Sequence, residues 1–113
     1  MKAITITIAG TTSAQTFYVP APVRCVATGM KLAVGSAVGS SKAFIVGKGT
    51  TAQLTATTTG TPSAGDVFSA AVNASDIFEA TDSMKITVPE LGVAGPVVMT
   101  IFYDPFLSGA SGA

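Results

Sequence analysis

Apolar residues recur at every second position along several stretches of this 113-residue chain, and this period constrains the fold more than any other feature. In Ile4–Ile8 three isoleucines alternate with two threonines, and in Met84–Val88 three apolar residues alternate with Lys85 and Thr87. Successive side chains of a β-strand point to opposite faces, so both segments are predicted to be half-buried strands. No stretch keeps the period of an amphipathic helix, and the chain is therefore predicted to be all-β.

Turn residues divide the chain into about eight short strands. The apolar segments that can form them lie within residues 4–8, 17–19, 23–34, 42–48, 52–58, 66–72, 77–80, 84–88 and 97–103. Short strands at this spacing predict an antiparallel β-sandwich, and eight strands suit a jelly-roll-like arrangement of two sheets. Gly29 indicates a bulge or bend, and Pro20 and Pro22 exclude a central strand there. We expect one domain over residues 1–107 and a Gly/Ser/Ala tail over residues 108–113.

The chain carries few charges, six basic and six acidic residues, which together make up 11% of the sequence. A typical soluble domain has roughly 25% charged residues. The low value fits a surface that is covered by partners, and it equally fits an exposed Thr-rich sheet. The basic residues are scattered, whereas binding to nucleic acids or to a membrane surface requires them to be clustered. We therefore expect neither kind of binding.

Residues that carry out catalysis are scarce. The chain has no histidine and a single cysteine, Cys25, so it cannot form a Ser–His or Cys–His pair or a typical zinc site. Asp76, Glu79 and Asp82 are close in sequence, as calcium ligands or paired glycosidase carboxylates would be, but aspartates at such positions usually form turns. Residues 47–51 contain a Gly-Lys pair without the rest of a phosphate-binding loop, and are predicted to form a β-turn. The sequence thus predicts a protein that is not an enzyme and has no metal or cofactor.

The N-terminal segment lacks the continuous apolar stretch of a signal peptide, because Thr5 and Thr7 interrupt it. No stretch reaches about 18 apolar residues, the length that a transmembrane helix needs. We therefore expect synthesis in the cytoplasm without export.

The segment Val97–Tyr103 is apolar on both faces, although a strand of a two-sheet sandwich needs only one apolar face. A loop, the tail or a neighbouring subunit could cover the second face. Met1–Ala9 is a candidate edge strand that could join a partner sheet. The candidate interface residues, which are all apolar or aromatic, are Ile4, Ile6, Ile8, Phe17, Tyr18, Val98, Phe102, Phe106 and Leu107.

Three stretches together resemble a known class of proteins. They are the Pro-flanked segment Tyr18–Arg24, the polar turn and alternating strand within Ser75–Val88, and the closing segment Gly95–Tyr103. In this order and size the chain resembles the small β-sandwich decoration, or cement, proteins of tailed-bacteriophage capsids. The similarity is one of pattern and covers most of the chain.

The resemblance implies a non-enzymatic protein that binds the outer surface of a phage head. There it would bridge subunits of the major capsid protein and stabilise the shell as a homo-oligomer, with a trimer favoured and a dimer possible. Two alternatives remain open. One is another virion position, such as a head fibre, tail or fibre component. The other is a carbohydrate-binding β-sandwich module.

Overall fold

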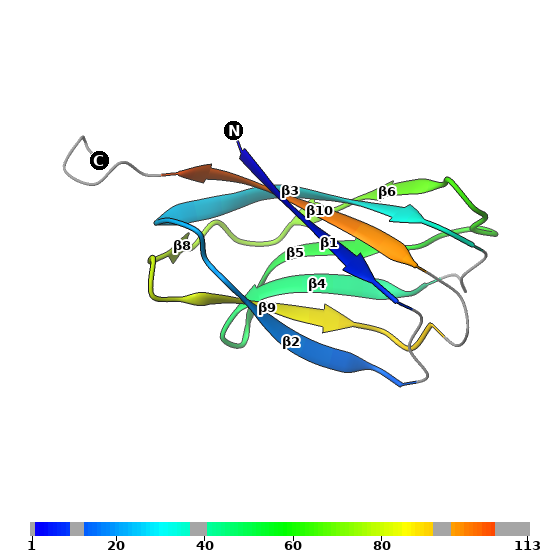
Figure 1. Cartoon of the computed structure of the whole chain (residues 1–113), viewed down its shortest axis with the longest axis horizontal. Coiled ribbons are helices and arrows are strands. Elements are labelled where there is room, and N and C mark those ends of the chain that lie inside the picture. Colours follow the sequence, from blue (N-terminus) through cyan, green and yellow to red (C-terminus); the bar gives the residue numbers. More distant parts are fainter. Residues whose placement is uncertain (1, 10–12, 37–40, 92–95, 106–113) are drawn as a thin grey trace.

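The computed structural model describes residues 2–9, 13–36, 41–91 and 96–105, and these residues form ten strands and no helix (Figure 1). The strands are β1 (Lys2–Ile8), β2 (Gln15–Pro20), β3 (Cys25–Val34), β4 (Ala43–Lys48), β5 (Thr51–Thr57), β6 (Val67–Ser69), β7 (Ala71–Val72), β8 (Ile77–Phe78), β9 (Ser83–Val88) and β10 (Val97–Pro105). The all-β prediction is confirmed. The described residues contain no helix that is long and apolar enough to cross a membrane.

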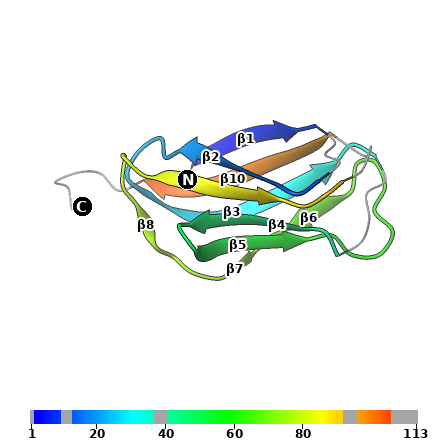
Figure 2. The same ribbon diagram turned by 90° about the horizontal axis from the view of Figure 1, so that it is seen from below.

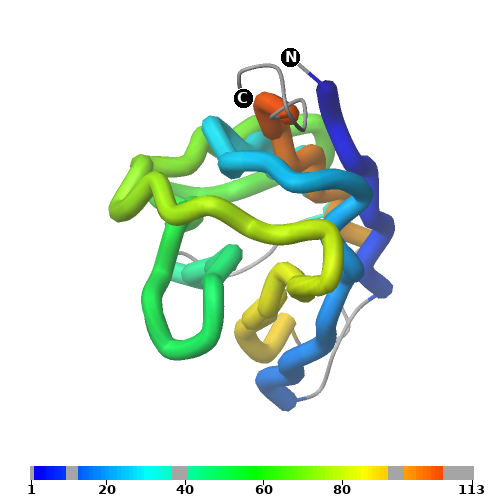
Figure 3. The backbone as a smooth tube through the Cα atoms, turned by 90° about the vertical axis from the view of Figure 1, so that its left-hand side faces the viewer, coloured from blue at the N-terminus to red at the C-terminus, as the bar shows by residue number. Residues whose placement is uncertain are grey.

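The strands form two antiparallel sheets that pack face to face, as Figures 1 and 2 show. Sheet A has the order β1-β10-β3-β6, and the short β8 also pairs with β3. Sheet B has the order β2-β9-β4-β5-β7. The predicted antiparallel β-sandwich is therefore confirmed. The principal extents are 46 × 22 × 20 Å, and Figure 3 views the fold end-on, along its longest axis.

The chain passes repeatedly between the sheets. Strand β1 lies in sheet A, β2 in sheet B, β3 in sheet A and β4 in sheet B, while the last strand, β10, returns to lie beside β1. The described residues form ten strands where about eight were expected. One difference is that the expected segment 66–72 forms two short strands, β6 and β7. The jelly-roll arrangement stays a prediction.

The inner faces of the two sheets form one apolar core. The alternating residues Met84, Ile86 and Val88 of β9 are fully buried, as the period of two predicts. From the opposite sheet, Met99 and Ile101 of β10 are also fully buried. Strands β3 and β10 contribute five and four buried residues to the core, because each lies inside sheet A with neighbours on both sides.

A β-bulge in β3 changes which residues face the core. Before it, Cys25 and Ala27 are buried, whereas after it the buried residues are at even positions and begin with Met30. The register with β10 shifts where Phe102 pairs with Gly29 and Tyr103 with Ala27, which leaves Thr28 as the extra residue. The expected irregularity at Gly29 is thus confirmed, one residue from its predicted position. The hydroxyl of Thr28 is buried at the bulge without a hydrogen-bond partner in the described structure.

Strand β2 confirms the prediction that the segment with Pro20 and Pro22 does not lie within a central strand. It ends at Pro20 and lies at the edge of sheet B, paired only with β9. Strand β10, by contrast, extends to Pro105 and does not stop at Asp104-Pro105 as expected. Pro105 still pairs with Cys25 at the end of the ladder, where the missing N–H group of proline costs little.

Candidate functional site

The edge strands β1 and β2 lie along the same long side of the sandwich, one from each sheet (Figure 2). Their inward-facing residues Ile4, Ile6, Phe17 and Val19 pack against the core but remain only half-buried. The inward residues of the central strands are fully buried because neighbours flank them on both sides. This side is therefore an open seam, which we define by these four residues.

The backbone of β1 is also available for pairing. All seven residues from Lys2 to Ile8 pair with β10 on one side, and no described strand pairs with the other side. Alternate N–H and C=O groups of an edge strand point away from the sheet and can bind another strand. Strand β1 contains no proline and no bulge, the usual devices that protect such an edge.

The outer face of sheet A is the second candidate surface. On β10, Val98, Thr100 and Phe102 point outward and are half-buried. Five of their six flanking partners are small: Ala3, Thr5 and Thr7 on β1, and Gly29 and Ala33 on β3. The sixth, opposite Thr100, is the exposed Lys31 of β3. The described part of the chain places no third layer over this face. The second apolar face of β10 was expected to be covered. Within the described residues, only β1 and β3 shield it, from the two sides.

Phe102 lies beside Gly29 on this face. A β-carbon added at Gly29 would lie 3.7 Å from the Phe102 ring, an ordinary van der Waals distance. The ring therefore lies against the backbone of β3 and does not project into solvent as a free side chain. This arrangement produces a flat surface that contains Lys31 as its one basic residue among the flanking positions.

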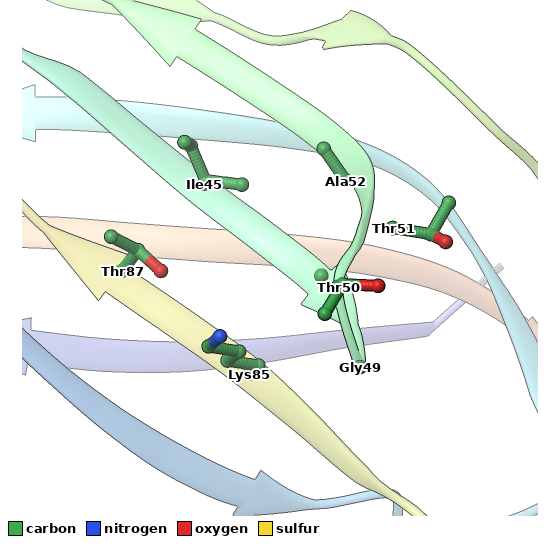
Figure 4. Close-up of a pocket in the computed structure, with 8 residues that line it drawn as sticks. Ile45, Gly49, Thr50, Thr51, Ala52, Lys85 and Thr87 are labelled. Carbon is green, nitrogen blue, oxygen red and sulfur yellow. The ribbon is translucent and has the colours of Figure 1, made fainter.

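The outer face of sheet B contains a shallow hollow of about 180 Å³ next to the β4–β5 turn (Figure 4). Its lining residues come from β4, β5, β9 and the turn between β4 and β5, and they are Ile45, Gly47, Gly49, Thr50, Thr51, Ala52, Lys85 and Thr87. Tyr18 of β2 pairs with the lining residue Lys85 and is 63% exposed, so it lies on the same face of sheet B, one strand away from β9. The hollow could not be predicted from the sequence, because it depends on the register between strands.

The structure separates the predicted interface residues into three groups. Ile4, Ile6 and Phe17 belong to the open seam, whereas Tyr18, Val98 and Phe102 lie on outer faces, Tyr18 on sheet B and the other two on sheet A. Ile8 is only 6% exposed and belongs to the core. Phe106 and Leu107 lie outside the described residues. The candidates therefore do not form one continuous site.

The carboxylates that are close in sequence are engaged in structural contacts. Asp82 Oδ2 accepts a hydrogen bond from the Glu79 N–H at 2.8 Å, which confirms the predicted turn. Glu79 forms an ion pair with Arg24 at 3.1 Å, and Asp76 Oδ2 accepts a hydrogen bond from Gln53 Nε2 at 2.9 Å. Within the described residues, no three acidic, histidine or cysteine side chains are grouped so that they could hold a metal ion.

Cys25 is fully buried in the core, as predicted from its apolar neighbours. Burial raises the pKa of its thiol above the ordinary value, because the apolar surroundings disfavour the thiolate. A buried neutral thiol is a poor nucleophile.

Comparisons of the chain with protein-family models, with curated proteins and with solved structures found no match. The candidate surfaces are therefore defined by the geometry of this chain alone.

Proposed function

We propose that the chain is a non-enzymatic virion structural protein, a decoration or cement protein on the outer surface of a phage capsid. Its partner would be the major capsid protein, and its role would be to bridge neighbouring subunits and stabilise the shell. The proposal extends the resemblance in sequence pattern described above. A small antiparallel sandwich with two broad sheet faces suits such a role.

One observation supports this proposal most directly, the flat outer face of sheet A. Val98 and Phe102 lie there among Ala, Gly and Thr residues, with few charges. Such a face can approach another protein surface closely, because it loses little side-chain entropy and requires the desolvation of few charges. On a shell, many such contacts act together, so that each can be weak.

Binding to shells tests the proposal. Expanded shells assembled from the major capsid protein that is encoded together with this chain should co-sediment with it and resist heating better when it is bound. Val98→Lys would place a charge on the outer face of sheet A and should lower binding at least tenfold. Val72→Lys is the matched control, because Val72 is 54% exposed at the edge of sheet B. Equal heat resistance of shells with and without the protein would contradict the cement role.

A carbohydrate-binding module is the second candidate function, and the exposed Tyr18 on the same face as the hollow favours it. Tyrosine rings stack on sugar faces, and the hydroxyls of Thr50 and Thr87 could bind sugar hydroxyls. Screening against a glycan array tests this function. Specific binding that is lost in Tyr18→Ala would support it, whereas an array without signals would leave the virion role as the better proposal.

Other virion positions, such as a head fibre, tail or fibre component, would use the same flat faces. A low-resolution map of the particle with the protein labelled would distinguish a position on the shell from one on the tail.

A further inference from the structure

We propose that β1 is the self-association surface of this protein and pairs antiparallel with β1 of a second copy across a two-fold axis at Thr5. The inference rests on the proposed function, since a decoration protein of the kind that the chain resembles is expected to be a homo-oligomer. The pairing would join the two A sheets into one continuous sheet.

The available sheet edges differ in length. Strand β1 offers seven residues, whereas β6, β7 and β8 offer only three, two and two. Strand β2 has six residues but ends in Pro20, which lacks a backbone N–H to donate. Among the described edges of a second copy, β1 itself is thus the best match for β1.

One pairing register of two β1 strands uses the whole edge. With Thr5 on the axis, Thr5 lies opposite its own counterpart, Ile4 opposite Ile6 of the other copy, and Ala3 opposite Thr7. This register overlaps all seven residues, and a shift in either direction shortens the ladder. Each core-facing residue of one β1 then lies opposite a core-facing residue of the other. This follows because a two-fold axis perpendicular to the sheet leaves the core-facing sides of both copies on the same side of the joined sheet.

The pairing would also cover part of the open seam. Ile4 and Ile6 point toward the core but are half-buried, since nothing described flanks them on the outer side. In the proposed pair they would contact the same two residues of the other copy. Cross-strand pairs of β-branched side chains stabilise a sheet by roughly 0.2–1 kcal/mol each.

Charge also permits the pairing. The one charged residue of β1, Lys2, lies at the end of the strand and would face Ile8 of the other copy. The two Lys2 residues would be separated by about 20 Å along the ladder, given a rise of about 3.4 Å per residue. Like charges are therefore never opposite each other.

Sedimentation equilibrium of the purified protein tests the association. We expect a dimer that dissociates at least tenfold more readily in Thr5→Lys, because the substitution places two ammonium groups opposite each other at the axis. Thr16→Lys is the matched control: it changes an exposed threonine of the other edge strand, β2, and should leave the dimer intact. A monomer at all concentrations, or a dimer that Thr5→Lys does not weaken, would overturn the inference.

Disulfide trapping tests the register. Thr5→Cys should form a disulfide-linked dimer under mild oxidation, since opposite residues in a sheet are close enough for a disulfide. Thr7→Cys should not, because it lies opposite Ala3 of the other copy, and Cys25 is buried. Equal trapping of both variants would exclude the Thr5 axis. These experiments need no shells, so a failure here leaves the shell-binding proposal intact, and failed shell binding leaves the dimer intact.

Discussion

Gln53 is a polar residue whose burial the sequence pattern does not predict. It lies within a Thr-rich alternating segment, yet it is fully buried. A register shift between β4 and β5 pairs Val46 with Leu54 and Gly47 with Ala52, which leaves Gln53 as the bulged residue. Its Nε2 donates to Asp76 Oδ2 at 2.9 Å, and its Oε1 accepts from the Asp76 N–H at 2.8 Å. Gln53 thus fastens the segment that precedes β8 to β5.

We predict that Gln53→Leu lowers the free energy of unfolding by about 1–3 kcal/mol, because the Asp76 N–H and carboxylate lose their partner. Urea denaturation followed by circular dichroism measures the change. Gln15→Leu is the control, since Gln15 is exposed on β2 and should shift the midpoint little. Equal effects of the two substitutions would show that the buried hydrogen bonds contribute nothing.

The thiol of Cys25 gives a prediction about pH. Its pKa is raised in the folded protein, so the unfolded chain releases the thiol proton at lower pH than the folded chain does. Stability is therefore unaffected well below the ordinary thiol pKa of 9.0 and falls as the pH rises through it. Cys25→Ala should not show this part of the loss of stability at alkaline pH. The free energies of unfolding of the two proteins, measured from pH 7 to 10, give the difference.

The burial of Cys25 also predicts that the native thiol reacts with a disulfide reagent only after unfolding. Rapid labelling of the native protein would contradict this burial.

At the scale of elements, central and edge strands should respond differently to the same substitution. Ile101 of β10 is fully buried, whereas its register partner Ile4 on β1 is half-buried at the open seam. We predict that Ile101→Ala costs about 2–5 kcal/mol, the usual range for a buried isoleucine. Ile4→Ala should cost clearly less, since the seam can relax or admit water. Thermal unfolding of the two variants under equal conditions makes the comparison, and equal losses would contradict the open seam.

The strands with long alternating runs could be predicted from sequence, since Ile4–Ile8 and Met84–Val88 each match a strand to within two residues. The short strands β6 and β7 could not be separated within the expected segment 66–72, because two or three residues carry no period, whereas β8 lies in the segment 77–80 that was expected separately. Pairing between β1 and β10, and the neighbours Tyr18 and Lys85, depend on register between segments that are far apart in the sequence. One sequence alone therefore identifies apolar candidates such as Val98, but not the surfaces that they form.

At the scale of the whole molecule, the sheet joins the two ends of the chain. Strand β1 pairs along its full length with β10, and β3 pairs on the other side of β10. Such pairings require closure of very long loops, so β-sandwiches fold slowly. We predict refolding on the scale of milliseconds to seconds, measured by stopped-flow circular dichroism after dilution from urea. Refolding within tens of microseconds would mean that local contacts dominate the transition state.

The pairing of Lys2 with Tyr103 also determines where attached segments leave the fold. A peptide joined before Lys2 and another joined after Pro105 would emerge from the same end of the sandwich, next to each other (Figure 1). The two halves of a split fluorescent reporter, one joined directly before Lys2 and the other directly after Pro105, would therefore meet without a long linker. The same geometry allows circular permutation, in which a short linker joins the old ends and new ends are opened in the turn at Gly49, away from both β1 and β10.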